Sequence, residues 1–361
     1  MASSGTRVLV VGAGIVGRSV AYFLSRRDID VVLLDSTKTP SPTTRASLGV
    51  LTRFNGGTSS YARLFRDGCA LHARLAADLA VEMGVDVGWR PLGSIELYLN
   101  PSDEWRLEEL LASSRERGCP VDRLDGRALR EMEPALAAEV WGGLYFPGDN
   151  RVDPSKLGAA LWASAARRGA VALCGDRVVQ IAQRGEGVEI VTEKGNHCAD
   201  FAVLAAGAWS GELAGQLGAQ VTVRPVRGQH ARFAGCPLQH LVHVDGHYMV
   251  PDGDETLVGA TVEEVGFDLR TTAAAVVDLS ARVEEVLGGV LPFLSHRAGL
   301  RPKPKNGRPL IGPLQASPRF FVASGHYKNG VLLGPITGQI IARWISEGVP
   351  GRDMSRFTPE R

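Results

Sequence analysis

The segment RVLVVGAGIVG near the N-terminus constrains the fold more than any other part of this 361-residue sequence. Its apolar, β-branched run 7–11 predicts a strand that is buried on both faces. A glycine-rich turn of the form GxGxxG follows, and residues 19–27 have the spacing of a helix. A second apolar run, 31–34, ends at Asp35. This order of strand, turn, helix and strand predicts a β-α-β unit.

The glycines of this turn have separate roles if the unit binds a dinucleotide. Gly12 permits the tight turn, Gly14 lets the backbone approach a pyrophosphate, and Gly17 allows the helix to pack closely on the strand. The helix N-terminus offers free N–H groups and a partial positive charge to the phosphates. Asp35 is placed to accept hydrogen bonds from an adenosine ribose, which argues against a cofactor with a 2′-phosphate. This site alone leaves NAD and FAD open, and the alternative is a tight turn without a ligand.

Three further segments favour FAD. Residues 43–51, TTRASLGVL, are small enough to pass close to a flat ring, and residues 203–210, VLAAGAWS, form a buried strand that ends beside Gly207. Residues 323–338, ASGHYKNGVLLGPITG, read as strand, turn and helix. The helix that starts at Gly330 would direct its positive end at a ring that gains negative charge on reduction. Each segment alone is also an ordinary loop or packing element.

The remaining pattern predicts an α/β fold whose two domains are interleaved. We expect strands at 93–99, 177–182, 187–192, 198–205 and 320–323, and helices at 59–83, 102–117, 153–168, 271–287 and 330–347. Ser102 is the expected N-cap of the second helix, and Asp153 with Pro154 opens the third. Alternating segments fill 221–262, with turns expected at Gly228, Gly246 and Asp252–Gly253.

Composition excludes several classes of partner. The net charge is +1 and no basic stripe occurs, so we expect no nucleic-acid role. Five cysteines without a CxxC pair predict neither a metal site nor a disulfide framework, and favour a reducing cytoplasm. The N-terminus lacks the pattern of a signal peptide, and no apolar run approaches the roughly 20 residues of a membrane helix.

Five motifs occur in an order that covers nearly the whole chain: GxGxxG with Asp35, TTRASLGVL, AAGAWS, GLRPKPKNGRPLIG and GHYKNGVLLGP. Together they resemble the glycine oxidase branch of the D-amino acid oxidase superfamily. The resemblance implies a Rossmann-like FAD-binding domain (1–84, 150–220 and 300–361) and a substrate domain built on a large antiparallel sheet (85–149 and 221–299). It implies FAD contacts at Gly12, Gly14, Ile15, Val16, Gly17, Asp35, Thr43, Thr44, Leu48, Gly49, Val50, Val178, Gly207, His326, Tyr327, Lys328, Asn329, Gly330, Val331 and Leu332. Relatives with covalent flavin use a histidine near the N-terminal loop or a cysteine in the C-terminal part. Here the first histidine is His72 and the last cysteine is Cys236, so we expect non-covalent FAD.

The resemblance also implies a substrate site. Arg301, in GLRPKP, would grip a substrate carboxylate with its planar guanidinium, and Tyr248 would add a second hydrogen bond. Lys328 stands where the family favours arginine, so the positive charge is kept but the planar guanidinium, which can form two parallel hydrogen bonds, is lost. His230 and His247 are further polar candidates near the same sheet, whereas Arg224 and Arg227 read as structural.

The reaction implied is the oxidative deamination of glycine, sarcosine or a D-amino acid. Hydride passes from the α-carbon of a neutral amine to flavin, and the products are an imine or 2-oxo acid, ammonia and H₂O₂ from O₂. Alternatives are a dehydrogenase with another electron acceptor, a sarcosine-type secondary-amine oxidase, a flavin monooxygenase and a non-enzymatic nucleotide-binding protein. The family also suggests a homo-oligomer.

Overall fold

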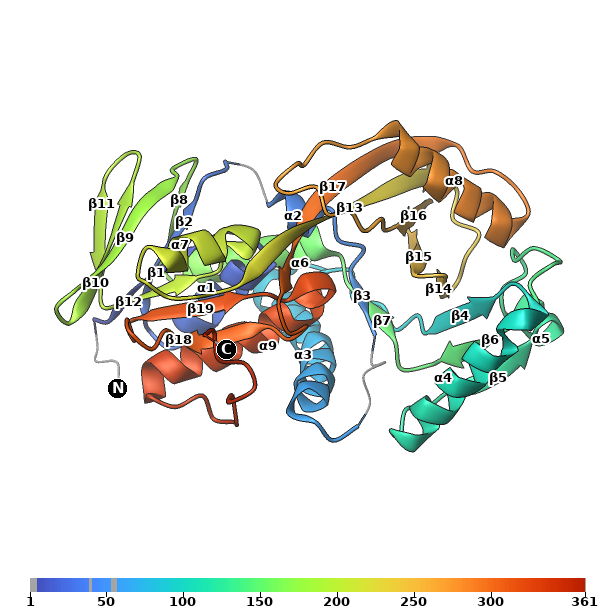
Figure 1. Ribbon diagram of the computed structural model, residues 1–361, viewed down its shortest axis with the longest axis horizontal. Coiled ribbons are helices and arrows are strands. Elements are labelled where there is room, and N and C mark those ends of the chain that lie inside the picture. The colour runs from blue at the N-terminus through green and yellow to red at the C-terminus, as the bar shows by residue number, and fades with distance from the viewer. Residues whose placement is uncertain (1–4, 39–40, 53–56, 361) are drawn as a thin grey trace.

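A six-stranded sheet forms the first half of the molecule (Figure 1). The computed structural model describes residues 5–38, 41–52 and 57–360. The strand order is β18-β19-β12-β1-β2-β8, all parallel except β18, so strands from the start, middle and end of the chain lie side by side. Their bounds are β1 Arg7–Val11, β2 Asp30–Asp35, β8 Val171–Cys174, β12 Phe201–Leu204, β18 Leu310–Pro313 and β19 Phe320–Ser324.

Both faces of this sheet are covered, which explains why β1 is apolar throughout. Val8 and Val10 belong to the core under the helices α1 Ile15–Ser25, α3 Ser60–Met83, α6 Pro154–Arg167 and α9 Gly330–Glu347. Leu9 and Val11 face the opposite way. They pack toward a three-stranded sheet made of β9 Val178–Arg184, β10 Gly187–Thr192 and β11 Asn196–Ala199, and toward α7 Ser210–Gly215.

An eight-stranded sheet forms the second half, in the order β17-β13-β16-β15-β14-β4-β6-β5. Neighbours are antiparallel except for the parallel pair β14 and β4. The bounds are β4 Ser94–Tyr98, β5 Asp122–Asp125, β6 Gly142–Phe146, β13 Val223–Ala234, β14 Leu241–Val244, β15 His247–Asp252, β16 Glu255–Gly259 and β17 Phe293–Pro304. Helix α8 Ala273–Leu287 packs on this sheet, and α4 Glu104–Glu116 and α5 Gly126–Met132 lie at its far end.

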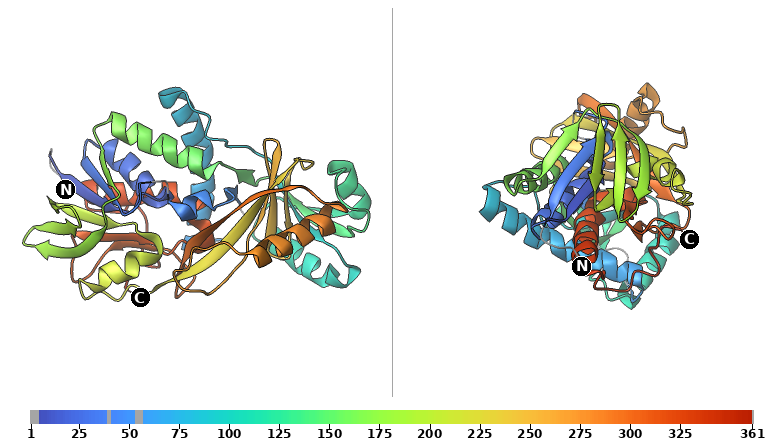
Figure 2. Two further views of the ribbon diagram at one scale, coloured as in Figure 1. Left: turned by 90° about the horizontal axis from the view of Figure 1, so that it is seen from above. Right: turned by 90° about the vertical axis from the view of Figure 1, so that its left-hand side faces the viewer.

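Short elements connect the two halves. They are α2 Pro42–Arg45, the pair β3 Val50–Leu51 and β7 Asn150–Arg151, and the 3₁₀ turns η2 Gly207–Trp209 and η3 Tyr327–Asn329, which contact β17. A further 3₁₀ turn, η1 Pro101–Asp103, joins β4 to α4 within the second half. Figure 2 shows an elongated molecule, with the three-stranded sheet at one end and α4 and α5 at the other. The chain crosses between the halves several times, as the interleaved pattern predicts. The exact boundaries of two domains stay a prediction.

Several local expectations are confirmed. Asp153 caps α6 by accepting hydrogen bonds from the N–H groups of Ser155 and Lys156 (2.8 and 3.0 Å), and Pro154 is the first helical residue. The turns at Gly246 and Gly253 have φ of 82° and 64°, the left-handed region that favours glycine.

Four expectations are wrong in detail. Helix α1 starts at Ile15, not at residue 19, because Gly17 packs inside its first turns. Ser102 is not an N-cap, because Pro101 starts a 3₁₀ turn and α4 begins only at Glu104. Segment 198–205 is two strands in different sheets, separated at Asp200, whose carboxylate accepts the N–H of Arg7 (2.7 Å). Gly228 makes no turn and lies inside the continuous strand β13.

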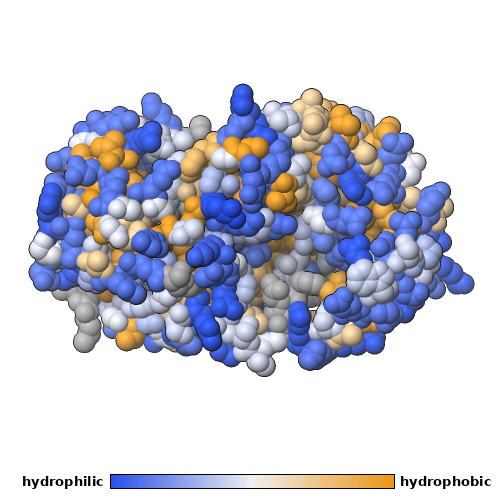
Figure 3. Space-filling view, in the orientation of Figure 1, coloured by the Kyte–Doolittle hydropathy of each residue, from blue (hydrophilic) through white to orange (hydrophobic). Residues whose placement is uncertain are grey.

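The visible surface is mostly hydrophilic, with hydrophobic residues in separate patches (Figure 3). None of the helices in the described part of the chain is both long and apolar enough to cross a membrane. The described residues also include no group of three histidine, cysteine or acidic side chains arranged to hold a metal.

Candidate active site

The glycine-rich turn between β1 and α1 is tied to the end of β2. The carboxylate of Asp35 accepts the N–H of Ala13 (2.6 Å) and both the N–H and the hydroxyl of Thr37 (2.7 Å each). Oδ1 accepts both bonds from Thr37, whereas Oδ2 accepts only the one from Ala13, so Oδ2 can still accept a hydrogen bond from a ligand hydroxyl. The turn is therefore fixed beside a carboxylate, as the sequence pattern predicts for a ribose site.

The N-terminus of α1 is open to an anion. Its N-cap is Gly14, which supplies no side-chain hydrogen bond, and no acidic residue lies in the first turn. A Cβ at Gly14 would meet nothing closer than 3.6 Å, whereas a Cβ at Gly17 would lie 1.8 Å from the Gly12 carbonyl. Gly17 is thus required for packing, and Gly14 leaves space before the helix. This geometry suits a phosphate group at a helix N-terminus.

A cavity lies between the two halves, beside this turn. It is lined by Ile15, Thr43, Thr44, Ala46, Ser47, Leu48, Gly49, Val50, Gly228, Gly246, Tyr248, Ala260, Gly299, Arg301, Tyr327, Lys328, Gly330 and Val331. The first residues of α9 border it, and the N-cap of α9, Asn329, makes no side-chain cap hydrogen bond. An uncapped helix end beside a largely apolar cavity fits a flat ring that becomes electron-rich. Together with the phosphate turn, these features fit FAD.

The structure brings the three predicted substrate residues together at this cavity. Arg301 comes from β17, Tyr248 from β15 and Lys328 from η3. They lie 53 and 27 positions apart in sequence, and only the pairing of the long strands with the α9 turn brings them close. Their contact with a substrate stays a prediction.

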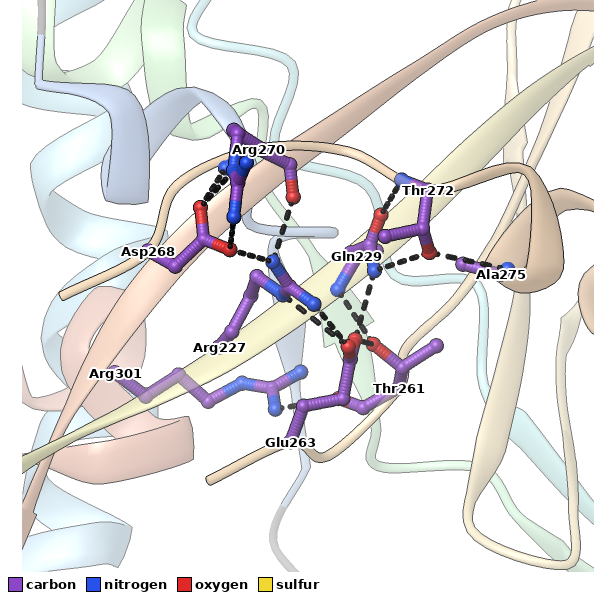
Figure 4. A network of polar contacts seen from close by, with 9 residues as sticks. All are labelled: Arg227, Gln229, Thr261, Glu263, Asp268, Arg270, Thr272, Ala275 and Arg301. Atoms are coloured by element: carbon purple, nitrogen blue, oxygen red, sulfur yellow. Dashed lines mark hydrogen bonds and ion pairs between the residues drawn. The ribbon is translucent and has the colours of Figure 1, made fainter. Parts of the chain in front are cut away.

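A hydrogen bond to a backbone carbonyl holds the Arg301 guanidinium in place. Its Nη1 donates a hydrogen bond to the carbonyl of Thr261 (2.8 Å), as Figure 4 shows. Burial lowers the pKa of the guanidinium from its usual value, although it remains a cation. This bond uses one of the five N–H groups, and no further hydrogen bond joins the guanidinium to the described residues, so the other groups can bind a carboxylate.

The nearest acid, Glu263, is committed to another arginine. Its carboxylate accepts bonds from Arg227 (2.5 Å), Gln229 (2.8 Å) and Thr261 (2.6 Å), and Arg227 also pairs with Asp268 (3.1 Å). Burial raises the pKa of Glu263, but these hydrogen bonds outweigh it and hold the pKa below its usual value. This supports the structural role expected of Arg227. Within the described part of the chain, Arg301 therefore forms no ion pair with an acidic side chain.

Gly228 explains how Arg301 reaches this position. A Cβ at residue 228 would lie 2.2 Å from Nη2 and 2.3 Å from Cζ of Arg301. The guanidinium therefore lies against bare backbone of β13. The sequence does not reveal this contact, because Gly228 and Arg301 are 73 residues apart.

Tyr248 is a neutral hydrogen-bonding group. Burial, and then the negative charge of Glu96, raise the pKa of its phenol far above the usual value. Its ring stacks on His243 with 4.2 Å between centroids, and His243 in turn contacts Glu96. The phenol thus stays protonated at any working pH and is oriented by a neighbour.

Apart from Asp35 and the glycines of the first turn, six predicted cofactor residues lie outside the cavity lining. His326 is buried and its Nε2 contacts the Thr337 hydroxyl (2.9 Å), while Asn329 donates to Tyr61 (3.4 Å). Leu332 lies in the core. Val16 packs against that core, Val178 starts β9, and the Gly207 carbonyl accepts the Ser324 hydroxyl (2.8 Å). A contact of these residues with FAD stays a prediction.

The threonine pair at 43 and 44 has a role that the sequence does not reveal. The hydroxyl of Thr44 accepts the N–H of Ile15 in α1 (3.0 Å). The hydroxyl of Thr43 contacts both the N–H and the carbonyl of Leu300 in β17 (3.1 Å each). His230, which was a candidate polar group, contacts the Ala46 carbonyl in the same segment (2.9 Å). His247 borders a neighbouring outer cavity, together with Lys328.

The fold and the cavity define the class: a protein with a dinucleotide-binding turn on a doubly wound sheet and a cavity bordered by a second, larger sheet. The chain belongs to the DAO family of FAD dependent oxidoreductases, which it matches over residues 7–344. It is therefore an FAD-dependent enzyme.

Named relatives cover almost the whole chain. The chain is 32% identical to glycine oxidase of Geobacillus kaustophilus strain HTA426, over 98% of this chain and 96% of that protein. The crystal structure of glycine oxidase from Geobacillus kaustophilus superposes with a TM-score of 0.94 at 31% identity, covering 99% of each chain. Iminodiacetate oxidase from Chelativorans sp. BNC1 superposes with a TM-score of 0.87 at 26% identity, covering 98% of this chain and 99% of that one.

Proposed function

We propose that this enzyme oxidises the carbon–nitrogen bond of a small amino acid, with non-covalently bound FAD as the electron acceptor. The observation that carries the proposal is the partly buried Arg301 guanidinium, which lines the cavity together with the first residues of α9. Glycine oxidases among the relatives support glycine as a candidate substrate. Iminodiacetate, named for one structural relative, is a glycine with a carboxymethyl group on its nitrogen and is a second candidate.

The side chains of the cavity bind and orient, and they supply no base. Arg301 and Tyr248 hold the substrate carboxylate, which fixes the α-carbon relative to the end of α9. No acid or histidine occurs among the described residues that line the inner cavity. The amine must therefore be neutral when it reacts. FAD, when bound, supplies the two-electron acceptor for the hydride that leaves the α-carbon.

The products follow from this balance. The amine loses a hydride and a proton and becomes an imine, which water hydrolyses to a 2-oxo acid and ammonia. Molecular oxygen takes the two electrons and two protons and becomes H₂O₂. A dehydrogenase that passes the electrons to another acceptor is the alternative, and a comparison of O₂ with artificial acceptors distinguishes the two.

The test uses the purified holoenzyme and its visible spectrum without oxygen. We expect the flavin to bleach on addition of glycine, sarcosine or a D-amino acid. We expect Arg301→Met to retain FAD but to lose at least about 100-fold in kcat/KM, the cost of removing a charged partner from a buried carboxylate. Retained FAD with unchanged kinetics would contradict the role of Arg301. A flavin that no amino acid bleaches would contradict the proposed function.

We further propose that the enzyme works in the cytoplasm as a homo-oligomer, with the two interleaved domains described above. The support is the family resemblance and, for the compartment, five free cysteines without a disulfide. Sedimentation at several protein concentrations tests the oligomer.

A further inference from the structure

The inner cavity carries two positive charges and no negative one. Among the described residues that line it, the charged side chains are Arg301 and Lys328. One substrate carboxylate, such as that of glycine, matches one of these charges. The second charge has no counterpart in the reaction described so far.

Lys328 has no acidic partner within the described part of the chain. Its ammonium lies 5.9 Å from the centroid of the Tyr327 ring. A second lysine near this ring, Lys303, does have an acidic partner, since it pairs with Glu264 (3.2 Å). Burial, and then the charge of Arg301, lower the pKa of Lys328. Lys328 is an exposed residue at the edge of the cavity, so an anion that enters can reach its ammonium, and the charge of Arg301 adds to the attraction.

Nearby acids do not supply this anion. Lys328 also borders an outer cavity of about 480 Å³, lined in part by Asp245, Glu263 and Asp278. Asp245 and Glu263 each pair with an arginine, Arg282 (3.6 Å) and Arg227 (2.5 Å) respectively. Asp278 lies beside His247 (3.7 Å), whose pKa burial lowers.

The position of Lys328 indicates where the missing anion would lie. Lys328 lines both cavities, together with Gly246 and Ala260, whereas Arg301 lines only the inner one. A group that extends from the amine or the α-carbon toward these shared residues would meet the ammonium.

We propose that Lys328 binds a second acidic group of the substrate, and that the preferred substrates are dicarboxylic amines. This class comprises glycines that carry a further carboxylate on the nitrogen or on the α-carbon. The inference rests on the proposed function for the position of the first carboxylate at Arg301. It differs from a role for Lys328 in holding electron-rich flavin, which would act equally on every substrate.

The first experiment measures binding and requires no turnover. Thiodiacetate and (methylthio)acetate are unreactive acids that differ by one carboxylate, and each is titrated into the holoenzyme while the flavin spectrum is recorded. We expect the wild type to bind thiodiacetate at least about 10-fold more tightly than (methylthio)acetate, the low end for a close charge pair. Lys328→Met should abolish this preference, Lys328→Arg should retain it, and the control Lys303→Met should behave as wild type.

The second experiment measures kcat/KM for two matched pairs: sarcosine with N-carboxymethylglycine, and D-alanine with D-aspartate. Lys328→Met should lower kcat/KM at least about 10-fold for the dicarboxylic member of a pair and less than about 3-fold for the other. The first pair tests a second carboxylate on the nitrogen, and the other pair tests one on the carbon.

Two results would overturn this assignment: equal losses for both members of each pair, or a wild type that binds (methylthio)acetate as tightly as thiodiacetate. If sarcosine or D-alanine reduces the flavin rapidly while thiodiacetate shows no preference, only the role of Lys328 fails. If no compound of either pair reduces the flavin, the proposed function fails as well.

Discussion

Substitution of Gly228 by alanine tests the position of the Arg301 guanidinium without touching the arginine. The added Cβ would lie 2.2 Å from Nη2 and 2.6 Å from Nη1 of Arg301. Non-bonded heavy atoms prefer about 3.5 Å, so the guanidinium must move by more than about 1 Å. The bond from Arg301 to the Thr261 carbonyl, 2.8 Å long, would be lost or bent.

The magnitude follows from this displacement. A misplacement of about 1 Å in a positioning group costs on the order of 100-fold in rate, which corresponds to about 2.7 kcal/mol of transition-state stabilisation. Stability should change much less, about 1 kcal/mol, because the displaced atoms are the far end of a flexible side chain. Gly228 also lies in a regular strand, where alanine is compatible with the backbone.

The assay is the rate of flavin reduction without oxygen over a range of substrate concentrations, together with thermal unfolding. We expect Gly228→Ala to retain FAD and to lose about 100-fold in kcat/KM. The control is Gly215→Ala at the end of α7, where a Cβ meets nothing within 4 Å. Unchanged kcat/KM in Gly228→Ala would show that the substrate carboxylate does not depend on the guanidinium held by β13.

Three further predictions concern single groups. Tyr248→Phe should lower kcat/KM about 10-fold with FAD retained, and the wild-type profile should show no phenol titration below pH 10, because burial raises that pKa. Thr44→Val removes the acceptor of the buried Ile15 N–H, so FAD should dissociate faster and unfolding should become about 1–3 kcal/mol easier, as a fluorescence release assay and urea melts can check. The pKa of buried His72 is lowered to about 4, below an unfolded value of about 6.5, so the unfolded chain binds the proton first and stability falls as pH drops from 6.5 toward 4. His72→Gln should reduce that slope by about 1.4 kcal/mol per pH unit, and an unchanged slope would assign the proton uptake to other groups.

The sequence predicted those parts of the fold that local patterns decide. The strand 7–11, the glycine-rich turn and the cap at Asp153 depend on neighbours within a few residues, and all three are confirmed. The start of α1 was misplaced because a glycine in a helix, Gly17, looks like part of a loop until its packing partner is known.

Long-range contacts were not predictable in the same way. Gly228 resembles a turn in a single sequence, and its contact with Arg301 appears only when β13 pairs with β17. The same limit applies to Thr261, whose backbone carbonyl fixes Arg301 and leaves no signal in residue type. Lys328 was singled out from a motif, but its lack of an acidic partner required the arrangement of the surrounding ion pairs.

The adjacent threonines that join α1 to β17 have a consequence for how long the enzyme keeps its flavin. Thr44 secures the first turn of α1, and Thr43 secures Leu300, the residue before Arg301. A carboxylate bound at Arg301 should therefore stabilise the first turn of α1, where FAD binds. By thermodynamic linkage, bound FAD should strengthen carboxylate binding by the same factor. Carboxylate ligands should slow the escape of FAD, so a cell rich in substrate would lose less of its holoenzyme than a starved one.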